Sequence, residues 1–501
     1  MQAFLVLLFN LAFASSLDFR IIHRYSDEAR GLLGLGEEPA PPVRGSLDYH
    51  RLLLKHDLSK HGRELLTGND SLALLQGNYT EDLGPRFGGI HYTFVDIGTP
   101  NVSFLVALDT GSDLFWVPCD CKHCQSVSPS EFPTLKKRLT YFTTNSSTTN
   151  KLLTCGDKAC SSSSCTGNSS VCPYTVRYLS ENTSTSGKLV EDVIHLFKPA
   201  TSSAITARII FGCGEQQTGL FLRGGAPNGL LGLGPGDVSL PSMLAKDGLI
   251  NDTFSMCFDT DGSGRILFGD RGAKSQQTTS FIPNSGVKSA YDVGIEQFTV
   301  GGRNITFRSF NALFDTGTTL TYLQSDAYQR VTEAFDSQIN LRRITNVDLS
   351  PYEYCYRLNG NEDTVTDIPA PSLSLTFQGG GNFSVVDPLV LVIGSDSRVL
   401  GFCLAVLESN FPIIGQNFMG GYRFAFDRER STLGWSPANC YHLEDGASFE
   451  HTPSPINQPV SQNRNDNSPF LKPPQQEAAA SFGITQTSSV FVVLFFLFIL
   501  F

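Results

Sequence analysis

In this sequence, two triplets that each contain a carboxylate have the residue types and the spacing that suggest catalytic chemistry. Residues 109–111 and 315–317 both read Asp-Thr-Gly, and each triplet follows an apolar run and precedes a hydroxyl residue, Ser112 or Thr318. A tight turn is the usual structure of such a triplet. A turn alone does not explain why each Asp follows residues that are expected to bury it, because burying a lone carboxylate is costly.

Two buried aspartates that face each other can share one proton, which relieves this cost and makes a catalytic pair. When two carboxylates adjoin, the pKa of one falls and the pKa of the other rises. The ionised aspartate can take a proton from a water molecule while the protonated one donates to the carbonyl oxygen under attack. We therefore predict that Asp109 and Asp315 are catalytic, and the titration belongs to the pair rather than to either residue. This chemistry needs no metal and no cofactor.

Residues beside each aspartate are predicted to support the pair. Glycine lets neighbouring backbone approach the carboxylates, and hydroxyl groups can hold them in orientation. The predicted supporting residues are Thr110, Gly111, Ser112, Thr316, Gly317 and Thr318.

An internal repeat indicates the elements that position these triplets. Leu-Leu-Gly at 230–232 follows the first triplet, and Ile-Ile-Gly at 413–415 follows the second. From Gly88 onward the chain consists of short β-branched and aromatic runs broken by Gly, Pro, Asn and Ser, which is typical of an all-β protein. Together these features predict two homologous β lobes related by a pseudo-twofold axis.

The composition excludes several other classes of protein. Of the 501 residues, 41% are hydrophobic, which is enough for large cores and excludes a wholly disordered chain. The formal net charge of −11 argues against a broad basic face for nucleic acid. The glycine-rich run at 232–236 lacks the βαβ context of a dinucleotide site, and we interpret its glycines as turns.

The 12 cysteines are predicted to form disulfides rather than a metal site. Cys119-x-Cys121-x-x-Cys124, with His123 inside it, also fits a metal knot, although disulfides are the commoner use of cysteine in a secreted chain. The pairing does not follow from the sequence. The disulfide candidates are Cys119, Cys121, Cys124, Cys155, Cys160, Cys165, Cys172, Cys213, Cys257, Cys355, Cys403 and Cys440.

The first residues have the features of a secretory signal peptide. Residues 1–13 form an apolar run, and Ala12-Phe13-Ala14 is a small-x-small cleavage pattern, although no basic residue precedes the run. A buried N-terminal strand is the alternative. Residues 17–87 contain no cysteine and include a helix-like stretch at 46–66, and we expect this leader to be a propeptide.

The last residues have the features of a lipid-attachment signal. Residues 490–501 are all apolar, but a spanning helix needs about 20 such residues. A polar spacer and, before it, three small residues complete the pattern for a glycosylphosphatidylinositol (GPI) anchor. A short membrane-embedded tail is the alternative. The candidate attachment residues are Ala478, Ala479 and Ala480.

Nine Asn-x-Ser/Thr sequons predict a glycosylated surface on a chain with a signal peptide. The candidate asparagines are Asn69, Asn78, Asn101, Asn145, Asn168, Asn182, Asn251, Asn304 and Asn382.

The paired triplets and their surroundings resemble the pepsin-like aspartic endopeptidases, specifically the plant-type branch related to nepenthesin and nucellin. The resemblance covers roughly residues 88–441. It implies a bilobal, all-β pepsin-like fold with a cleft between two pseudo-twofold related lobes. It matches Tyr178 with the tyrosine of the flap that closes over substrate, and Trp116 with the tryptophan that packs near the flap. Many relatives have Gly-Asp-Gly after this tyrosine, whereas this sequence has Leu-Ser-Glu at 179–181.

The same resemblance implies the domain organisation. The cysteine-rich region corresponds to an insertion of the nepenthesin type, and Cys355 is expected to pair with Cys403. The expected parts are a signal peptide at 1–16, a propeptide or leader at 17–87, an N-terminal β lobe with the cysteine-rich insertion at 88–275, a C-terminal β lobe at 276–441, a linker rich in Pro, Asn and Gln at 442–480, and a removed GPI signal at 481–501.

The function implied by this resemblance is that of an aspartic endopeptidase, made as a zymogen, that hydrolyses peptide bonds at acidic pH. Its expected partners are polypeptide substrates and, through the anchor, the outer leaflet of the plasma membrane. No nucleic acid is expected as a partner, and the protein is expected to be a monomer. Secretion to the apoplast is the alternative location. The alternative function is a catalytically inactive pepsin-fold protein that binds or inhibits another protein at the cell surface.

Overall fold

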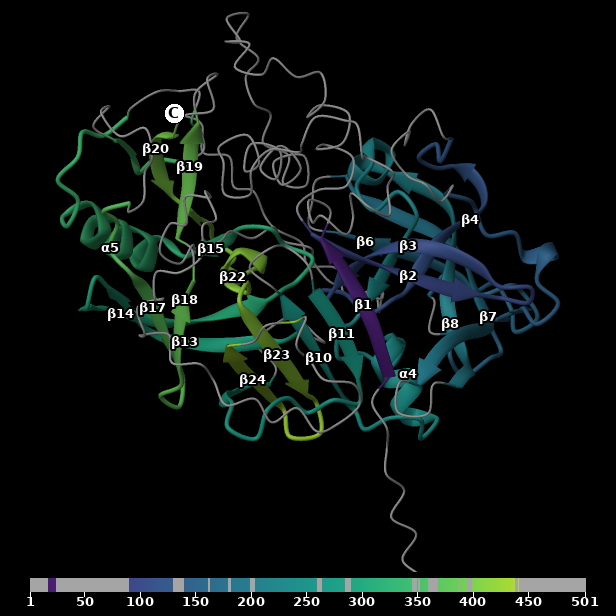
Figure 1. The fold of residues 1–501 in the computed structure, drawn as a ribbon. Coiled ribbons are helices and arrows are strands. Elements are labelled where there is room, and N and C mark those ends of the chain that lie inside the picture. Colours follow the sequence, from purple (N-terminus) through teal and green to yellow (C-terminus); the bar gives the residue numbers. More distant parts are fainter. Residues whose placement is uncertain are drawn as a thin grey trace, which may run out of the picture.

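The computed structural model describes residues 17–23, 90–128, 139–160, 163–178, 182–198, 203–258, 264–283, 290–344, 349, 352–358, 368–386, 388–393, 399–437 and 440. Strands dominate these ranges, so the predicted all-β class is confirmed. No helix within them is both long and apolar enough to cross a membrane. In Figure 1 the strands of the first half lie on one side, those of the second half lie on the other, and a sheet lies between them.

The strands of the first half belong to one large sheet that carries the first Asp-Thr-Gly triplet near its middle. Its two longest strands, β7 and β8, pair along almost their whole length, and β6 forms a hairpin with β7. The strands of this half are β2 (His91–Ile97), β3 (Val102–Asp109), β9 (Leu230–Gly232), β4 (Trp116–His123), β8 (Ser203–Thr218), β7 (Ser184–Lys198), β5 (Lys151–Leu152) and β6 (Pro173–Arg177).

The second half contains a seven-stranded sheet and a three-stranded sheet. The seven-stranded sheet contains, in spatial order, β18 (Asn382–Val385), β17 (Leu373–Phe377), β13 (Asp292–Val300), β14 (Arg303–Phe314), β22 (Ile413–Ile414), β15 (Thr321–Leu323) and β21 (Val406–Glu408). The three-stranded sheet contains β16 (Cys355–Arg357), β20 (Val399–Leu404) and β19 (Leu389–Ile393).

Within the described residues the helices are few and short. The longest, α5 (Ser325–Asp336), buries Ala327, Tyr328, Val331 and Phe335 on one face, a spacing that follows the helical repeat. The others are α4 (Leu240–Lys246) and the 3-10 turns η1 (Thr144–Ser146), η3 (Gly219–Arg223) and η5 (Gln416–Phe418).

A six-stranded section of the large sheet joins the two halves of the chain. Here β10 of the first half pairs with β23 of the second half along six residues. Its core is aromatic, since the rings of Phe254 and Phe426 stack at 4.6 Å and Tyr291 packs against Phe426 at 4.9 Å. The strands of this section are β12 (Gln277–Ser280), β24 (Thr432–Pro437), β23 (Tyr422–Asp427), β10 (Thr253–Phe258), β11 (Gly264–Phe268) and β1 (Leu17–His23).

Strand β1 places the start of the predicted leader inside the folded protein. It pairs antiparallel with β11 on one side and, through its last two residues, with β2 on the other. Figure 1 shows it crossing the centre of the molecule between the two halves. The other residues of the leader, and the helix-like stretch at 46–66, lie outside the described residues.

Six disulfides account for all 12 cysteines. Cys119, Cys121 and Cys124 all belong to disulfides, so the disulfide prediction holds over the metal-knot alternative. The bridge between Cys355 and Cys403 that the resemblance implied is present. The pairs are Cys119–Cys213, Cys121–Cys124, Cys155–Cys165, Cys160–Cys172, Cys257–Cys440 and Cys355–Cys403.

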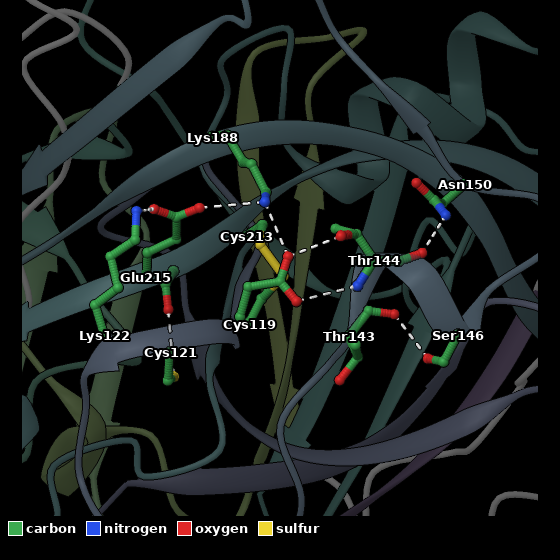
Figure 2. A network of polar contacts seen from close by, with 12 residues as sticks. Cys119, Cys121, Lys122, Thr143, Thr144, Ser146, Asn150, Lys188, Cys213 and Glu215 are labelled. Atoms are coloured by element: carbon green, nitrogen blue, oxygen red, sulfur yellow. Dashed lines mark hydrogen bonds and ion pairs between the residues drawn. A yellow bond between two sulfur atoms is a disulfide. The ribbon is translucent and has the colours of Figure 1, made fainter.

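A charged network surrounds the Cys119–Cys213 bridge, as Figure 2 shows. The ammonium group of Lys188 lies 2.8 Å from a carboxylate oxygen of Asp120 and 3.2 Å from one of Glu215. The same Asp120 oxygen accepts a hydrogen bond of 2.7 Å from the hydroxyl group of Thr144. These contacts tie β4, β7 and β8 together next to the bridge.

Asp292, at the start of β13, is expected to make the stability of the protein depend on pH. It is 6% exposed, and burial raises its pKa to about 6. A carboxyl group with a raised pKa in the folded state contributes stability that is present below the unfolded pKa of about 4 and is lost as the pH rises through about 6. We expect Asp292→Asn to increase the free energy of unfolding by about 1–2 kcal/mol at pH 7 and to leave it unchanged at pH 3.5.

Chemical denaturation at both pH values checks this expectation. An equal gain at pH 3.5 and pH 7 would contradict it, because packing rather than charge would then account for the gain.

Candidate active site

The two Asp-Thr-Gly triplets lie at equivalent places in the two halves of the structure. Strand β3 ends on Asp109 and pairs in parallel with β9, with Asp109 opposite Gly232. Strand β14 ends just before Asp315 and pairs in parallel with β22, with Phe314 opposite Ile414. The repeat in the sequence therefore corresponds to a repeated pairing of strands, and each downstream apolar-apolar-Gly segment lies beside its own triplet.

The threonines of the two triplets connect the halves by reciprocal hydrogen bonds. The backbone N–H of Thr110 donates to the hydroxyl oxygen of Thr316 at 3.1 Å, and the N–H of Thr316 donates to the hydroxyl oxygen of Thr110 at 2.9 Å. Each hydroxyl group then donates across to the other strand, Thr110 to Phe314 O at 3.0 Å and Thr316 to Leu108 O at 3.2 Å. Because all four bonds are buried, they fix the two triplets against each other.

The two carboxylates receive the same set of hydrogen bonds. Gly111 N–H donates to Oδ1 of Asp109 at 3.0 Å, and the hydroxyl group of Ser112 donates to Oδ2. Gly317 N–H donates to Oδ1 of Asp315 at 2.8 Å, and the hydroxyl group of Thr318 donates to Oδ2 at 2.5 Å.

Both carboxyl groups are fully buried, and their donors fix their orientation. The two carboxyl groups therefore have equivalent surroundings, in loops that the threonine bonds fix against each other. The structure thus brings together all the predicted supporting residues of the two triplets.

The apolar-apolar-Gly segments and the residues that follow them hold the triplets by backbone hydrogen bonds. In the first half, Leu233 N–H donates to Asp109 O at 2.8 Å. In the second half, Asp315 N–H donates to Ile414 O at 2.9 Å and Gln416 N–H donates to Thr318 O at 2.9 Å. These bonds fix the position of each aspartate relative to the neighbouring strand of its sheet.

Gln416 is a buried residue of the site that the sequence did not indicate. Its side-chain amide donates to Thr316 O at 2.7 Å, and its amide oxygen accepts from Nδ1 of His91 at 2.8 Å. His91 is the first residue of β2 and lies opposite the last residue of β1. Gln416 therefore connects the second triplet to the strand that borders the leader.

Tyr178 and Trp116 contact each other, as expected for the flap region. The indole N–H of Trp116 donates to the phenolic oxygen of Tyr178 at 2.9 Å. The ring of Phe221, in η3, packs edge-on against both residues, at 4.8 Å from Trp116 and 4.9 Å from Tyr178. Phe221 is a further residue that sequence reasoning missed, because only the fold brings it to this place.

The hydroxyl group of Tyr178 remains protonated next to the first aspartate. Burial and the nearby charge of Asp109 raise its pKa well above the usual value, although hydrogen bonds to Trp116 and Ser112 oppose this rise. The phenol can therefore act as a neutral hydrogen-bonding group at any physiological pH. Its backbone N–H donates to Thr183 O at 2.9 Å, which closes the turn between β6 and β7, but residues 179–181 lie outside the described residues.

Seven of the nine predicted sequons fall within the described residues. Six of their asparagines are exposed, while Asn251 is half-buried. Asn182 is exposed and has a φ of 56°, in the turn that follows Tyr178. Two sequons, Asn69 and Asn78, and the GPI attachment candidates lie outside the described residues. The six exposed asparagines are Asn101, Asn145, Asn168, Asn182, Asn304 and Asn382.

Two family models match the chain, one in each half. Residues 91–270 match the model described as xylanase inhibitor N-terminal, and residues 290–437 match the model described as xylanase inhibitor C-terminal.

Three similar proteins are named as aspartic proteinases or proteases. "Aspartic proteinase-like protein 1" of Arabidopsis thaliana is 41% identical over 440 residues, which are 85% of this chain and 82% of that protein. "Aspartyl protease family protein 1" of the same plant is 42% identical over 438 residues, 86% of this chain and 82% of that protein. "Aspartic proteinase nepenthesin-2" of Nepenthes gracilis is 29% identical over 469 residues, 86% of this chain and 98% of that protein.

Solved structures are similar in fold. Basic 7S globulin from soybean has a TM-score of 0.54 and 20% identity, with 73% of this chain and 97% of that chain covered. The structure titled edgp has a TM-score of 0.56 and 21% identity, with 73% and 95% covered. At such low identity these structures indicate the architecture and nothing about activity.

Proposed function

This chain belongs to the plant family of pepsin-like aspartic proteases, and we propose that it is an active endopeptidase that cuts polypeptides at acidic pH. Within the described residues its fold is the bilobal, all-β fold predicted from the sequence. The single observation that supports activity best is the matched pair of carboxyl groups. Asp109 and Asp315 receive equivalent donors and are fixed by the reciprocal threonine bonds.

In the proposed mechanism, one water molecule lies between the two carboxyl groups. The ionised aspartate accepts a proton from this water, and the water oxygen adds to the carbonyl carbon of the peptide bond. The protonated aspartate donates its proton to the carbonyl oxygen, which gives a neutral tetrahedral intermediate. The aspartate that took the proton from water then gives it to the departing nitrogen, while the other aspartate accepts a proton from a hydroxyl group of the intermediate. The C–N bond breaks, which leaves a carboxylic acid, an amine and a dyad that again holds one proton.

An inhibitor or binding function is the rival proposal, and the description of the matching family models as a xylanase inhibitor gives it weight. A binding protein on this scaffold does not require two intact carboxyl groups. Here both triplets are complete, and Tyr178 and Trp116 are joined by a hydrogen bond. These features support the enzyme over the binding protein, since function depends on the site rather than on the fold.

Digestion of a denatured protein tests the proposal. Purified protein with its leader removed is incubated with denatured substrate from pH 3 to pH 6, with and without pepstatin. We expect cleavage that pepstatin abolishes. If pepstatin-sensitive cleavage is absent over this whole range, the enzyme proposal is wrong and the binding proposal gains support.

Replacing Trp116 by Phe is expected to lower kcat/KM by about tenfold, because the phenol of Tyr178 loses a buried donor worth about 1–3 kcal/mol. The matched control is Trp435→Phe, since Trp435 in β24 is also buried and donates from its indole to Asn382 O in β18 at 3.2 Å, a bond that includes no residue of the triplets and neither Trp116 nor Tyr178. Both variants should lose similar stability in thermal unfolding, but only Trp116→Phe should lose activity. Equal losses of activity would contradict a specific role for the Trp116–Tyr178 bond.

We extend the proposal to the location of the protein. The signal-like start, the six disulfides and the six exposed sequon asparagines support passage through the secretory pathway. The pattern around Ala478–Ala480 supports a GPI anchor at the extracellular face of the plasma membrane, with a monomeric, glycosylated catalytic part. Release of the protein from intact cells by a phosphatidylinositol-specific phospholipase tests the anchor, and retention of the protein on the cells would contradict it.

A further inference from the structure

Asp113, one residue beyond the first triplet and its serine, lies in a cradle formed by the segment at 232–236. The N–H of Gly236 donates to Oδ1 of Asp113 at 2.8 Å. A Cβ atom on Gly234 would lie 2.3 Å from this oxygen, and one on Gly236 would lie 2.4 Å from Oδ2. A Cβ atom on Gly232 would lie 2.3 Å from the main-chain carbonyl carbon of Asp113.

The three glycines allow close approach to Asp113, and the run also bends at 234–236 and turns at its end, where Ser239 N–H donates to Gly236 O at 3.1 Å. None of them has a positive φ, so each could adopt its backbone conformation with a side chain. The alternation of glycine in this run is explained by the space that Asp113 occupies. Close approach to Asp113 is thus a second reason for these glycines, beside the turn that was predicted from the sequence.

The cradle also holds Asp109. Leu233 N–H donates to Asp109 O at 2.8 Å, and Gly234 N–H donates to Ser112 O at 2.8 Å. Together with the bond from Gly236 to the Asp113 carboxyl group, three donors of one segment hold the loop that carries the first aspartate. Asp113 contributes the only side chain among the three acceptors.

The second half of the site lacks this carboxyl group. Thr319 occupies the corresponding position after the second triplet, and its carbonyl oxygen accepts from Asn417 N–H at 3.2 Å. Thr319 is buried and carries no charge. Asp113 therefore breaks the pseudo-twofold symmetry of the site at the side of Asp109.

The charges around Asp113 are mixed. Arg428, in the turn between β23 and β24, approaches Gly234 O at 3.4 Å and forms an ion pair with Asp252 at 3.1 Å. Burial raises the pKa of Asp113 to about 6; the Gly236 bond and Arg428 oppose this rise, while Asp109 and Asp237 add to it. The phenol of Tyr291 lies on the same side and donates to Leu233 O. In acid the Asp113 carboxyl group is neutral, and near neutral pH it adds a negative charge next to Asp109.

We propose that Asp113 is a positioning residue for Asp109. Its carboxyl group fastens the loop that carries Asp109 to the 232–236 segment, and its protonation state acts on the catalytic pair. The proposal rests on the proposed endopeptidase function. The Asp113 anion disfavours a second negative charge on Asp109, so it helps the pair to retain its shared proton. At acidic pH the neutral group acts only through its hydrogen bond.

Three variants test this role, with kcat and KM measured on an oligopeptide from pH 3 to pH 7. Asp113→Ala removes the anchor, and we expect kcat to fall about 10- to 100-fold while KM changes less than about threefold. Asp113→Asn retains an oxygen that can accept from Gly236, so its kcat should recover to about tenfold above that of the Ala variant. The control is Asp247→Asn, at the exposed end of α4, which removes a charge that is not among those acting on Asp113 and should leave kcat and the pH profile unchanged.

The pH profile separates positioning from a merely structural role. In Asp113→Asn the descending limb of kcat/KM should move to lower pH by about 0.5 unit, because no Asp113 anion remains to disfavour a second negative charge beside it. An unshifted limb, or an Ala variant as active as the wild type, would overturn the proposal.

Thermal unfolding provides a readout that does not need activity. With a raised pKa, Asp113 contributes stability that is lost as the pH rises from about 4 to about 6. The midpoint of unfolding of Asp113→Asn should therefore exceed that of the wild type by about 2 °C at pH 7 and match it at pH 3.5. If the wild type cuts no peptide but this difference is found, the proposed function fails while the buried position of the Asp113 carboxyl group stands. If the difference is absent, the proposal for Asp113 fails regardless of activity.

Discussion

Replacing Asp109 or Asp315 by Asn is expected to reduce kcat by at least about 10³-fold, because each carboxyl group is needed to accept or to donate a proton. The amide is almost isosteric with the acid, so its oxygen can still accept from Gly111 or Gly317. The folded state should therefore persist, with a midpoint of thermal unfolding equal to or above that of the wild type. Steady-state cleavage of an oligopeptide at pH 4 measures the loss.

The matched control is Asp247→Asn, at the exposed end of α4, which should cut at the wild-type rate. If an Asn variant at residue 109 or 315 retained more than a tenth of the wild-type kcat, the assignment of the dyad would be wrong. A loss accompanied by unfolding would also count against it, since the assignment predicts inactive but folded protein.

Replacing Gly232 by Ala is expected to cost about 4 kcal/mol of folding free energy, as severe overpacking does in a buried backbone contact. A Cβ atom at this position would lie 2.3 Å from the main-chain carbon of Asp113 and 2.6 Å from Leu114 N, so a strand and a loop rather than a flexible side chain would have to move. The movement would also displace Asp109, which lies opposite Gly232 in the β3–β9 pair. Urea denaturation and peptidase activity measure the two effects.

The control for this variant is Gly248→Ala, at the end of α4. This glycine has a φ of +70°, and a Cβ atom added to it would have no other atom within 4 Å, so alanine there should cost only about 1 kcal/mol of backbone strain. Similar costs for the two variants would contradict a steric cause at Gly232. An unchanged kcat in a destabilised Gly232→Ala protein would contradict the coupling to Asp109.

The parts of the site that are local in sequence could be predicted from it. Each aspartate, its hydroxyl partner and its glycine lie within four consecutive residues, and the duplication of this block indicated two halves. The apolar-apolar-Gly segments were predictable because they repeat too. Their role, a parallel strand pairing beside each triplet, became visible only in the fold.

The parts that depend on distant contacts could not be predicted. Gln416 binds His91 across 325 positions of the chain, and nothing in the local pattern of either residue indicates this contact. Phe221 lies in a 3-10 turn far along the chain from Trp116, and only the fold brings the two rings into contact. The close approach of the glycines at 232–236 to Asp113 was not predicted, because it leaves no sign in the sequence that distinguishes it from a turn.

The disulfides show the same limit. Crowding of cysteines in the first half indicated bridges but not partners, because many pairings are compatible with one spacing. Cys355–Cys403 was the exception, and it came from the family resemblance rather than from the spacing.

The Cys257–Cys440 bridge joins residues 183 positions apart, and Asp315, the second aspartate of the proposed dyad, lies inside this covalent ring. A single cut anywhere between the two cysteines therefore opens the ring without releasing a fragment. The Cys119–Cys213 bridge, with a separation of 94, gives the same protection to much of the first half. The endopeptidase activity proposed for this chain would expose it to its own cuts, and after a cut inside either ring the disulfide keeps Asp109 and Asp315 in one covalently linked molecule.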